Sequence, residues 1–223
     1  MIPGWGRWVA GVGAFLVLSA FGFATIQPVQ VLPRIRLAPG FAFVDQGGQP
    51  FTSDATRGEV VLYGFAYGDC GSECDSIQET MAEVAARADA EIDLGDAEFR
   101  MVTVSIDPVS DGDRLPELAE AWGADGERWR WATGEDPENL RTVLMSGFEV
   151  YHQQVADGSF AFDSRYVLVD GWGVIRGEYR YSTLAEDADK LVRHIGLLGE
   201  EIRNSKGVTS VAYEAAHLFM CYP

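Results

Sequence analysis

The feature that most constrains this chain is a pair of cysteines, Cys70 and Cys74, placed between a strand-like segment and a helix-like one. Residues 60–66 are all apolar or small, which predicts a strand covered on both faces. Beyond Asp75, apolar side chains recur at helical spacing, which predicts a helix; they are Ile77, Met81, Val84 and Ala88. A CxxxC pair between a buried strand and a helix start is typical of thiol chemistry.

The spacing of the two cysteines suits more than one kind of chemistry. One helical turn can bring their Cα atoms within the roughly 4.4–6.8 Å that a disulfide needs. Two thiolates at that separation also suit a soft metal such as Cu(I). A helix N-terminus lowers the pKa of a thiol, whereas the acidic neighbours Asp69, Glu73 and Asp75 oppose that effect. A structural disulfide is the alternative, but so short a loop constrains the unfolded chain little. We therefore predict a redox or metal-binding role for Cys70 and Cys74.

The N-terminal segment predicts a membrane anchor. Residues 8–26 form a run of 19 residues without a charge, which is long enough to span a bilayer. A cleavable signal has an apolar core of only about 7–15 residues, so we predict residues 1–27 to be one uncleaved N-terminal transmembrane helix. Arg7 precedes the run and places the N-terminus in the cytoplasm. After a linker at 28–38, the rest of the chain is expected on the extracytoplasmic (periplasmic) side of the cell membrane, where disulfides persist.

The charge of the chain excludes some partners. Its formal net charge of −17 argues against nucleic acid and against adsorption to anionic lipid. It suits a basic protein partner or solubility alone. With 223 residues, of which 47% are hydrophobic, the chain can build one sizeable domain and an attached segment.

The order of elements predicts the fold class. Strands and helices alternate and then give way to an antiparallel hairpin and a closing helix, which is the order of thioredoxin-like proteins. We predict an α/β fold over residues 39–203, with a thioredoxin-like central sheet and helices on both faces. The cysteines then lie at the carboxyl end of a strand, where such folds place their sites. The expected strands are 60–66, 99–106, 129–133, 166–170 and 174–179, with a hairpin at 41–52, and the expected helices are 75–90, 115–122, 139–145 and 184–202.

Several stretches together resemble the SCO/SenC family, and they follow its order and spacing over about residues 39–195. These stretches are Tyr63–Ala66 before Cys70–Cys74, then Val104–Pro108, Phe148–Tyr151 and Ser164–Asp170. The family consists of membrane-anchored, thioredoxin-like proteins that help to deliver copper to the CuA centre of cytochrome c oxidase. The resemblance implies copper as the metal, and it implies three kinds of partner: cytochrome c oxidase subunit II or another membrane electron-transfer complex, a thiol–disulfide reductant, and the membrane itself.

The chain departs from the family at one copper ligand. The family binds copper through the two CxxxC cysteines and a histidine that precedes a late strand. Alignment without gaps puts Phe162 at that position, and Gly71 and Asp75 replace the prolines that usually flank the cysteines. The resemblance therefore carries over Cys70 and Cys74, but not the third ligand. Two thiolates hold Cu(II) poorly, so weaker copper retention than in the family is expected.

Few other residues are candidates for the missing ligand. His152, in the expected loop 151–160, is either a third copper ligand or a solvated surface residue. His194 on the last helix is expected to be solvated or to cap the helix, and His217 in the tail is expected to form no site. Asp107, at the end of the neighbouring strand, either reaches the site or caps the next helix.

The C-terminal tail, residues 204–223, lies outside the part that resembles the family. Its apolar residues either pack on their own domain, lie at the membrane interface or dock on a partner. Cys221 is the odd cysteine, so it is either buried or bonded to another chain.

Two functions from different classes fit these residues. The first is a metallochaperone or thiol–disulfide oxidoreductase that assembles a respiratory copper centre, with Cys70 attacking and Cys74 resolving. The second is a non-catalytic accessory subunit of a membrane electron-transfer complex, in which the thioredoxin-like domain is an interaction module. A peroxiredoxin-type peroxidase is disfavoured because Cys70 lacks the Thr or Pro that usually precedes the reactive cysteine.

Overall fold

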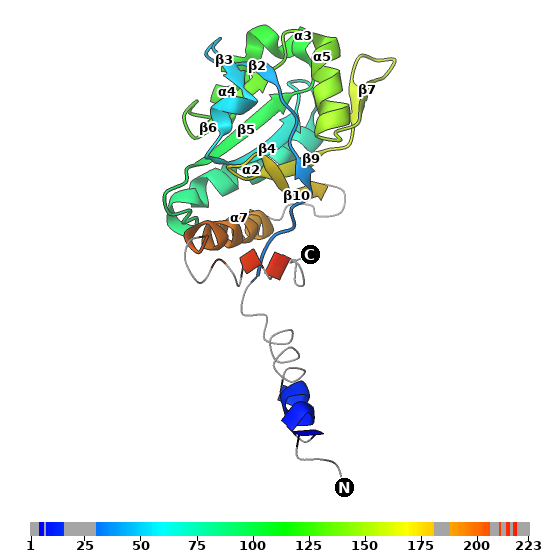
Figure 1. Ribbon diagram of the computed structural model, residues 1–223. Helices are drawn as coiled ribbons and strands as arrows, with labels where there is room; N and C mark the ends of the chain where they lie inside the picture. The colour runs from blue at the N-terminus through cyan, green and yellow to red at the C-terminus, as the bar shows by residue number, and fades with distance from the viewer. Residues whose placement is uncertain are drawn as a thin grey trace.

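A computed structural model describes residues 5–6, 8–15, 30–180, 188–205, 210, 213–214 and 216–217. Its centre is an eight-stranded sheet in the order β1-β10-β9-β4-β5-β6-β2-β3, and β7 and β8 form a separate hairpin (Figure 1). The strands are β1 (Arg36–Leu37), β2 (Ala42–Asp45), β3 (Pro50–Thr52), β4 (Val60–Ala66), β5 (Phe99–Ser105), β6 (Trp129–Thr133), β7 (His152–Gln154), β8 (Phe160–Phe162), β9 (Arg165–Val169) and β10 (Val174–Arg180). The helices are α2 (Ser72–Glu91), α3 (Pro108–Asp111), α4 (Leu115–Trp122), α5 (Pro137–Thr142) and α7 (Ala188–Arg203), with short helical turns at Ser53–Thr56, Gly112–Arg114 and Val143–Gly147.

Strand β4 lies at the centre of the sheet, and all seven of its residues are buried. It pairs in parallel with β5 and antiparallel with β9, and β5 pairs in parallel with β6. Helices α2 and α4 supply the crossovers that parallel neighbours require. Because parallel strands end at the same edge of a sheet, the segments that follow β4 and β5 meet there. These are the cysteine loop and α3.

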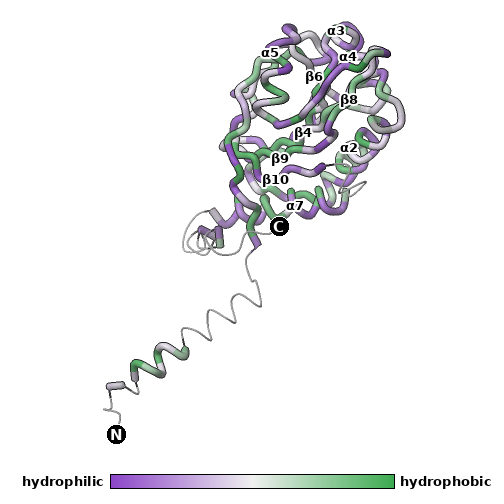
Figure 2. The backbone as a smooth tube through the Cα atoms, turned by 90° about the vertical axis from the view of Figure 1, so that its right-hand side faces the viewer, coloured by the Kyte–Doolittle hydropathy of each residue, from purple (hydrophilic) through white to green (hydrophobic). Residues whose placement is uncertain are grey.

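The helices cover both faces of the sheet, as the sequence predicted (Figures 1 and 2). One face packs against α2 and α7, in a core that includes Leu62, Met81 and Ile195. The other face packs against α4 and α5, in a core that includes Tyr63 and Phe148. Alternate residues of β4 enter the two cores because successive side chains of a strand point to opposite faces. The α/β class and the helices on both faces are therefore confirmed.

The first described residues include a helical stretch. Residues 8–15 are helical, and the apolar side chains of Trp8, Val12 and Phe15 are exposed. No helix among the described residues is both long enough and apolar enough to cross a membrane. Of the predicted transmembrane helix at residues 1–27, residues 1–4, 7 and 16–27 lie outside the described ranges.

The predicted linker and tail both contact the domain. Val31 and Leu32 are buried, and Arg36–Leu37 form the edge strand β1 against β10. In the tail, Ala216 is fully buried and His217 Nε2 lies 2.9 Å from the carboxylate of Glu201 in α7. The described tail residues thus pack on their own domain, which is one of the three alternatives. Cys221 and the predicted start of the last helix at residue 184 lie outside the described ranges.

Two glycines of α7 give a matched test of the packing. A Cβ at Gly199 would collide with the backbone carbonyl of Asp93, whereas a Cβ at Gly196 would meet nothing within 4 Å. We expect Gly199→Ala to lower the free energy of unfolding by about 1–3 kcal/mol, because overpacking forces the backbone to shift. Gly196→Ala is expected to raise it by about 0.5–1 kcal/mol, since alanine restricts the unfolded chain.

Urea denaturation of the two variants and the wild type measures both effects. Equal stability of the two variants would contradict the packing of α7 against the segment at Asp93.

Candidate functional site

Cys70 and Cys74 form a disulfide at the carboxyl end of β4, with their Cα atoms 5.6 Å apart. The chain between them turns at Gly71, which has φ 72° and ψ −153° and stands at the N-cap of α2. Residues other than glycine rarely adopt this backbone conformation. Gly71, where the family usually has a proline, thus permits the turn that joins the loop to the helix. The structure shows the oxidised form of the pair.

The two cysteines differ in their surroundings. Cys74 is buried in the first turn of α2, whereas Cys70 is only half-buried in the preceding loop. After reduction, the unpaired amides at the start of α2 would favour a thiolate at this end of the helix. The more accessible sulfur is the one that a partner thiol reaches first. The roles of Cys70 as attacking and Cys74 as resolving residue stay a prediction.

A buried carboxylate accepts a hydrogen bond from the backbone of the cysteine loop. Asp111, at the end of α3, is almost fully buried. Its Oδ2 accepts hydrogen bonds from the Gly68 backbone N–H at 2.9 Å and from the Ser105 hydroxyl at 2.6 Å. Its Oδ1 meets no hydrogen-bond donor among the described residues and lies 2.8 Å from where a Cβ on Gly68 would be. Asp111 therefore fixes the backbone two residues before Cys70 and leaves no room for a side chain at position 68.

Burial raises the pKa of Asp111, and the hydrogen bonds from Ser105 and Gly68 partly offset this rise. Arg114 lies beside the same loop, with its Nη1 3.4 Å from the carboxylate of Asp69, the residue before Cys70. Because this contact is exposed, it adds little to stability. The loop is thus held at two points, by a buried acid and by a surface cation.

Asp107, which the sequence placed either at the site or at a helix cap, is a cap. Its carboxylate accepts a hydrogen bond from the Ser110 backbone N–H at 3.1 Å at the start of α3. The acid that reaches the cysteine loop is instead Asp111, four residues later. Sequence analysis missed it. The available signal was the spacing of Asp107 and Asp111, which are one helical turn apart directly after β5.

The β7–β8 hairpin is fastened over the segment that leads to the cysteines. The ring of Tyr67 meets the rings of Phe160 and Phe162 edge to face, with centroids 5.3 and 6.0 Å apart. The Phe160 backbone N–H donates to the Tyr67 hydroxyl at 3.1 Å. Phe162, the residue aligned with the family's histidine, therefore packs on Tyr67, which precedes Cys70 by three residues. At this position the chain has an aromatic ring instead of an imidazole.

His152 lies in the same hairpin and is buried rather than solvated. It pairs with Phe162 across the two strands, its ring centroid is 6.2 Å from that of Phe160, and its Nδ1 is 3.3 Å from the Val150 carbonyl oxygen. Burial lowers the pKa of His152, against an opposing effect of the Val150 carbonyl, so burial favours the neutral, ligand-competent imidazole. Among the described residues, no three His, Cys, Asp or Glu side chains gather as a metal site. Ligation by His152 stays a prediction.

Of the other two histidines, His194 differs from expectation. His194 is buried inside the domain, with its Nδ1 2.8 Å from the Tyr179 hydroxyl, so the prediction of a solvated or capping residue is wrong. His217 lies 2.9 Å from the carboxylate of Glu201, in a polar network at the far end of the domain. Both histidines lie in the C-terminal part of the chain. Their surroundings are set by residues distant in sequence, Tyr179 and Glu201.

The raised pKa of Asp111 predicts a pH dependence of stability. A carboxyl group whose pKa is higher in the folded than in the unfolded chain (about 3.9) destabilises the fold as it ionises. We expect the free energy of unfolding of the wild type to fall relative to that of Asp111→Asn as the pH rises from acid to neutral. Urea titrations of both proteins in the disulfide form, over that range, measure the difference.

The exposed neighbour Asp113 provides the matched control, since Asp113→Asn changes a solvated surface group and is expected to alter stability little at any pH. A difference between wild type and Asp111→Asn that stays constant with pH would contradict the role assigned to burial.

Known proteins resemble this chain over the domain just described. The profile of the SCO1/SenC family matches residues 30–196. The SCO1 protein homolog of Bacillus subtilis (strain 168) is 22% identical over 167 residues, which cover 74% of this chain and 82% of that protein. A putative copper-binding protein of Stutzerimonas stutzeri is 24% identical over 152 residues, 68% of this chain and 73% of that protein.

A solved structure shows the same fold. The structure of BsSco, described as having a disulfide switch and as a member of the Sco family of cytochrome c oxidase assembly proteins, has a TM-score of 0.65 at 19% identity. The match covers 76% of this chain and 98% of BsSco. Because the family profile spans most of the chain and includes both cysteines, the chain belongs to the SCO1/SenC family.

Proposed function

We propose that this protein handles copper and thiol–disulfide exchange in the assembly of a respiratory copper centre, the CuA centre of cytochrome c oxidase. The observation that carries the proposal is the Cys70–Cys74 disulfide at the carboxyl end of β4 in a chain of the SCO1/SenC family. Support for the partner comes from BsSco, whose family is described as one of cytochrome c oxidase assembly proteins. Subunit II, which carries CuA, is the proposed target.

The thiol chemistry follows from the difference in access to the two sulfurs. A thiolate of a reductant attacks Cys70 Sγ, the Cys70–Cys74 bond breaks, and Cys74 leaves as a thiolate. A second thiol of the reductant then attacks the mixed disulfide and releases Cys70. The reductant becomes a disulfide, and the two cysteines gain two electrons and two protons. In the reverse direction, the reduced Cys70 attacks a disulfide of the target and Cys74 resolves the intermediate.

Copper is the proposed cargo of the reduced form. Two thiolates one helical turn apart are soft donors that suit Cu(I), and the disulfide must be reduced before either sulfur can bind a metal. His152, buried in the hairpin that packs on Tyr67, is the imidazole proposed as a third ligand. Reaching the sulfurs would require the hairpin to move, because the described side chains form no three-ligand cluster.

The proposed location is the outer face of the cell membrane, with residues 1–27 as a transmembrane anchor. Residues 8–26 carry no charge, and the apolar side chains described in the helical stretch 8–15 are exposed. Exposed apolar side chains over two helical turns find a favourable environment in lipid. The extracytoplasmic side also preserves the disulfide between oxidation and reduction cycles.

A second function is a non-catalytic accessory subunit of a membrane electron-transfer complex. The specific observation in its favour is Phe162, which packs as an aromatic residue on Tyr67 where the family pattern has a copper ligand. A domain that has lost copper retention but keeps its fold can serve as an interaction module.

Replacing Phe162 with histidine tests the copper proposal. We expect Phe162→His to strengthen Cu(II) retention by about tenfold or more, because single contributions to metal sites cover that range. Anaerobic copper titration of the reduced full-length chain in detergent, followed by visible spectroscopy, measures it. Phe160→His is the matched control, since Phe160 lies two residues earlier on the same strand and also packs on Tyr67.

A wild-type chain that already retains Cu(II) as tightly as Phe162→His would contradict weak retention. The role of His152 is read from the same titration: if it is a ligand, His152→Ala lowers Cu(II) retention in the wild-type background.

Loss of the two thiols tests the function in the cell. We expect Cys70→Ser with Cys74→Ser to lower the CuA content and the amount of assembled oxidase in membranes of the producing organism. Cys221→Ser, which leaves the pair intact, serves as the control for cysteine removal. Unchanged CuA content, together with co-purification of the double variant in a large complex, would instead favour the accessory-subunit function.

A further inference from the structure

The end of the domain opposite the disulfide carries an exposed apolar surface. We call Ile35, Leu37 and Trp172 the base patch; these side chains are 45%, 71% and 82% exposed. The patch lies at the amino end of β4, because the Gly58 backbone N–H donates to the Gly171 carbonyl at 2.9 Å. The disulfide follows the carboxyl end of the same strand. Exposed apolar side chains that cluster at one end of a domain indicate an interaction surface.

The three residues of the base patch lie together. Leu37 pairs with Val174 across β1 and β10, and the Ala38 backbone N–H donates to the Gly173 carbonyl at 2.8 Å. Leu37 therefore lies beside the turn that carries Trp172. Ile35 precedes Leu37 by two residues, so it shares the same face of the extended chain.

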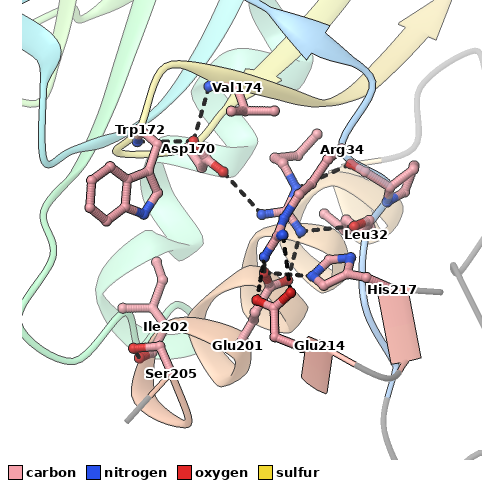
Figure 3. A network of polar contacts seen from close by, with 12 residues as sticks. Leu32, Arg34, Asp170, Trp172, Val174, Glu201, Ile202, Ser205, Glu214 and His217 are labelled. Carbon is pink, nitrogen blue, oxygen red and sulfur yellow. Dashed lines mark hydrogen bonds and ion pairs between the residues drawn. The ribbon is translucent and has the colours of Figure 1, made fainter. Parts of the chain in front are cut away.

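A cavity of about 990 Å³ opens next to this patch. Its apolar lining includes Val174, Leu198 and Ile202, and Trp172 forms part of its wall. Figure 3 shows Trp172, Ile202 and Ser205 on one side of the polar network that surrounds Asp170 and Glu201. The base patch and the cavity thus form one surface that combines apolar side chains with a polar margin.

Arginines border this surface. Arg57 donates through Nη1 to the Trp172 carbonyl oxygen, which holds the guanidinium against the backbone of the turn that carries the exposed indole. Arg34 lines the same cavity and pairs with Glu214 at 2.9 Å; its side chain is 48% exposed. Arginine beside tryptophan at an apolar surface is the combination found where proteins meet the headgroup region of a bilayer, with apolar stems in contact and charges outward.

A buried arginine fixes the direction in which the chain leaves this surface. Arg176 donates to the carbonyl oxygens of Leu32 at 2.8 Å and Pro33 at 3.1 Å. Ion pairs hold its guanidinium to Asp170 at 3.0 Å and Glu201 at 2.6 Å. Because its side chain is only 2% exposed, these contacts are shielded from water. The segment that enters the domain from the N-terminal side is therefore clamped at residues 32–33.

The C-terminal tail strengthens this clamp. Glu214 pairs with Arg34, and His217 lies 2.9 Å from the same Glu201 that pairs with Arg176. The tail, which lies beyond the matched family region of residues 30–196, thus contributes to holding the entering segment against the domain.

The length of chain before the clamp sets how far the base patch lies from the apolar run. That run ends at Ile26, and Val31 is the first buried residue among those that the structure describes. Five residues span at most about 17 Å when fully extended. If the run lies in a bilayer, the base patch is held within reach of the lipid headgroups.

We propose that the base patch rests on the surface of a phospholipid bilayer, with Trp172 at the headgroup level and Arg57 and Arg34 near lipid phosphates. This inference rests on the proposed membrane anchor. The net charge of −17 disfavours attraction to anionic lipid, so the proposed surface is zwitterionic phosphatidylcholine. Docking at this end holds β4 with its cysteine end away from the membrane. The seven residues of β4 place the disulfide about 20 Å above the base patch.

Fluorescence quenching by lipid tests the proposal on the full-length chain. The protein is reconstituted into phosphatidylcholine vesicles with brominated acyl chains, and the emission of Trp172 is obtained as wild type minus Trp172→Phe. We expect this emission to fall about twofold or more relative to unbrominated vesicles, since an interfacial indole lies close to the acyl chains. The matched control places a tryptophan at Val109 of α3, beyond β5 at the disulfide end and also 82% exposed. Its emission is obtained as that of the double variant Val109→Trp, Trp172→Phe minus that of Trp172→Phe. This difference is expected to be the same in brominated and unbrominated vesicles.

The outcomes separate docking from anchoring. Five tryptophans remain in Trp172→Phe, and Trp122, Trp129 and Trp131 belong to the domain. Quenching of the remaining emission therefore reports Trp5 and Trp8 in the N-terminal segment. Quenched Trp5 and Trp8 with an unquenched Trp172 would overturn docking, leave the anchor standing and point to a protein occupant of the patch. Emission that is unquenched throughout would overturn both. Equal quenching at positions 172 and 109 would overturn the proposed orientation.

Discussion

The burial of β4 on both faces is the constraint on which the rest of the structure depends. All seven of its residues are buried, so the strand cannot tilt or slip in register without moving apolar side chains between the two cores. Its carboxyl end therefore delivers the Cys70–Cys74 loop to a fixed place beside Asp111 and Tyr67. Its amino end equally fixes Gly58 against the β9–β10 turn, where the base patch lies. Local thiol geometry and the placement of the domain thus follow from one strand.

Much of this could be predicted from sequence because the decisive patterns are local. Continuous apolar runs marked the central strands, helical spacing marked the inner face of α2, and the CxxxC spacing gave a disulfide of ordinary reach. Asp111 was missed because its role depends on a contact across 43 residues, to the backbone of Gly68. His194 is expected to be solvated or to cap the helix because nothing near it in sequence shows that Tyr179 supplies a buried partner. A polar residue's surroundings are set by topology, and a single sequence does not encode topology in short patterns.

Phe162 shows how one substitution changes the chemistry without changing the fold. A phenylalanine in the β7–β8 hairpin can pack on Tyr67 and add contact area to the cover over the loop. A ligating histidine at that position would instead have to leave a nitrogen free for the metal. Aromatic packing therefore stabilises the closed hairpin at the expense of a ligand. The loss of one donor weakens Cu(II) binding more than Cu(I) binding, because two thiolates satisfy the softer ion. On the proposed function, the site is consequently biased towards Cu(I) and towards exchange.

On the proposed function, weak copper retention and a fixed orientation of the domain both suit a carrier that meets its target at a membrane. A protein tethered beside its target encounters it at an effective concentration set by the tether, in the millimolar range for short linkers. At such a concentration, transfer needs rapid release more than tight holding, since differences in affinity lie mostly in the dissociation rate. On the proposed anchoring, a clamped entry segment, held by Arg176 at Leu32 and Pro33, limits how far the domain can turn its cysteines towards the lipid. On the proposed anchoring, the height of the disulfide above the bilayer is then set by the length of β4, and the target site must lie at that height to receive copper.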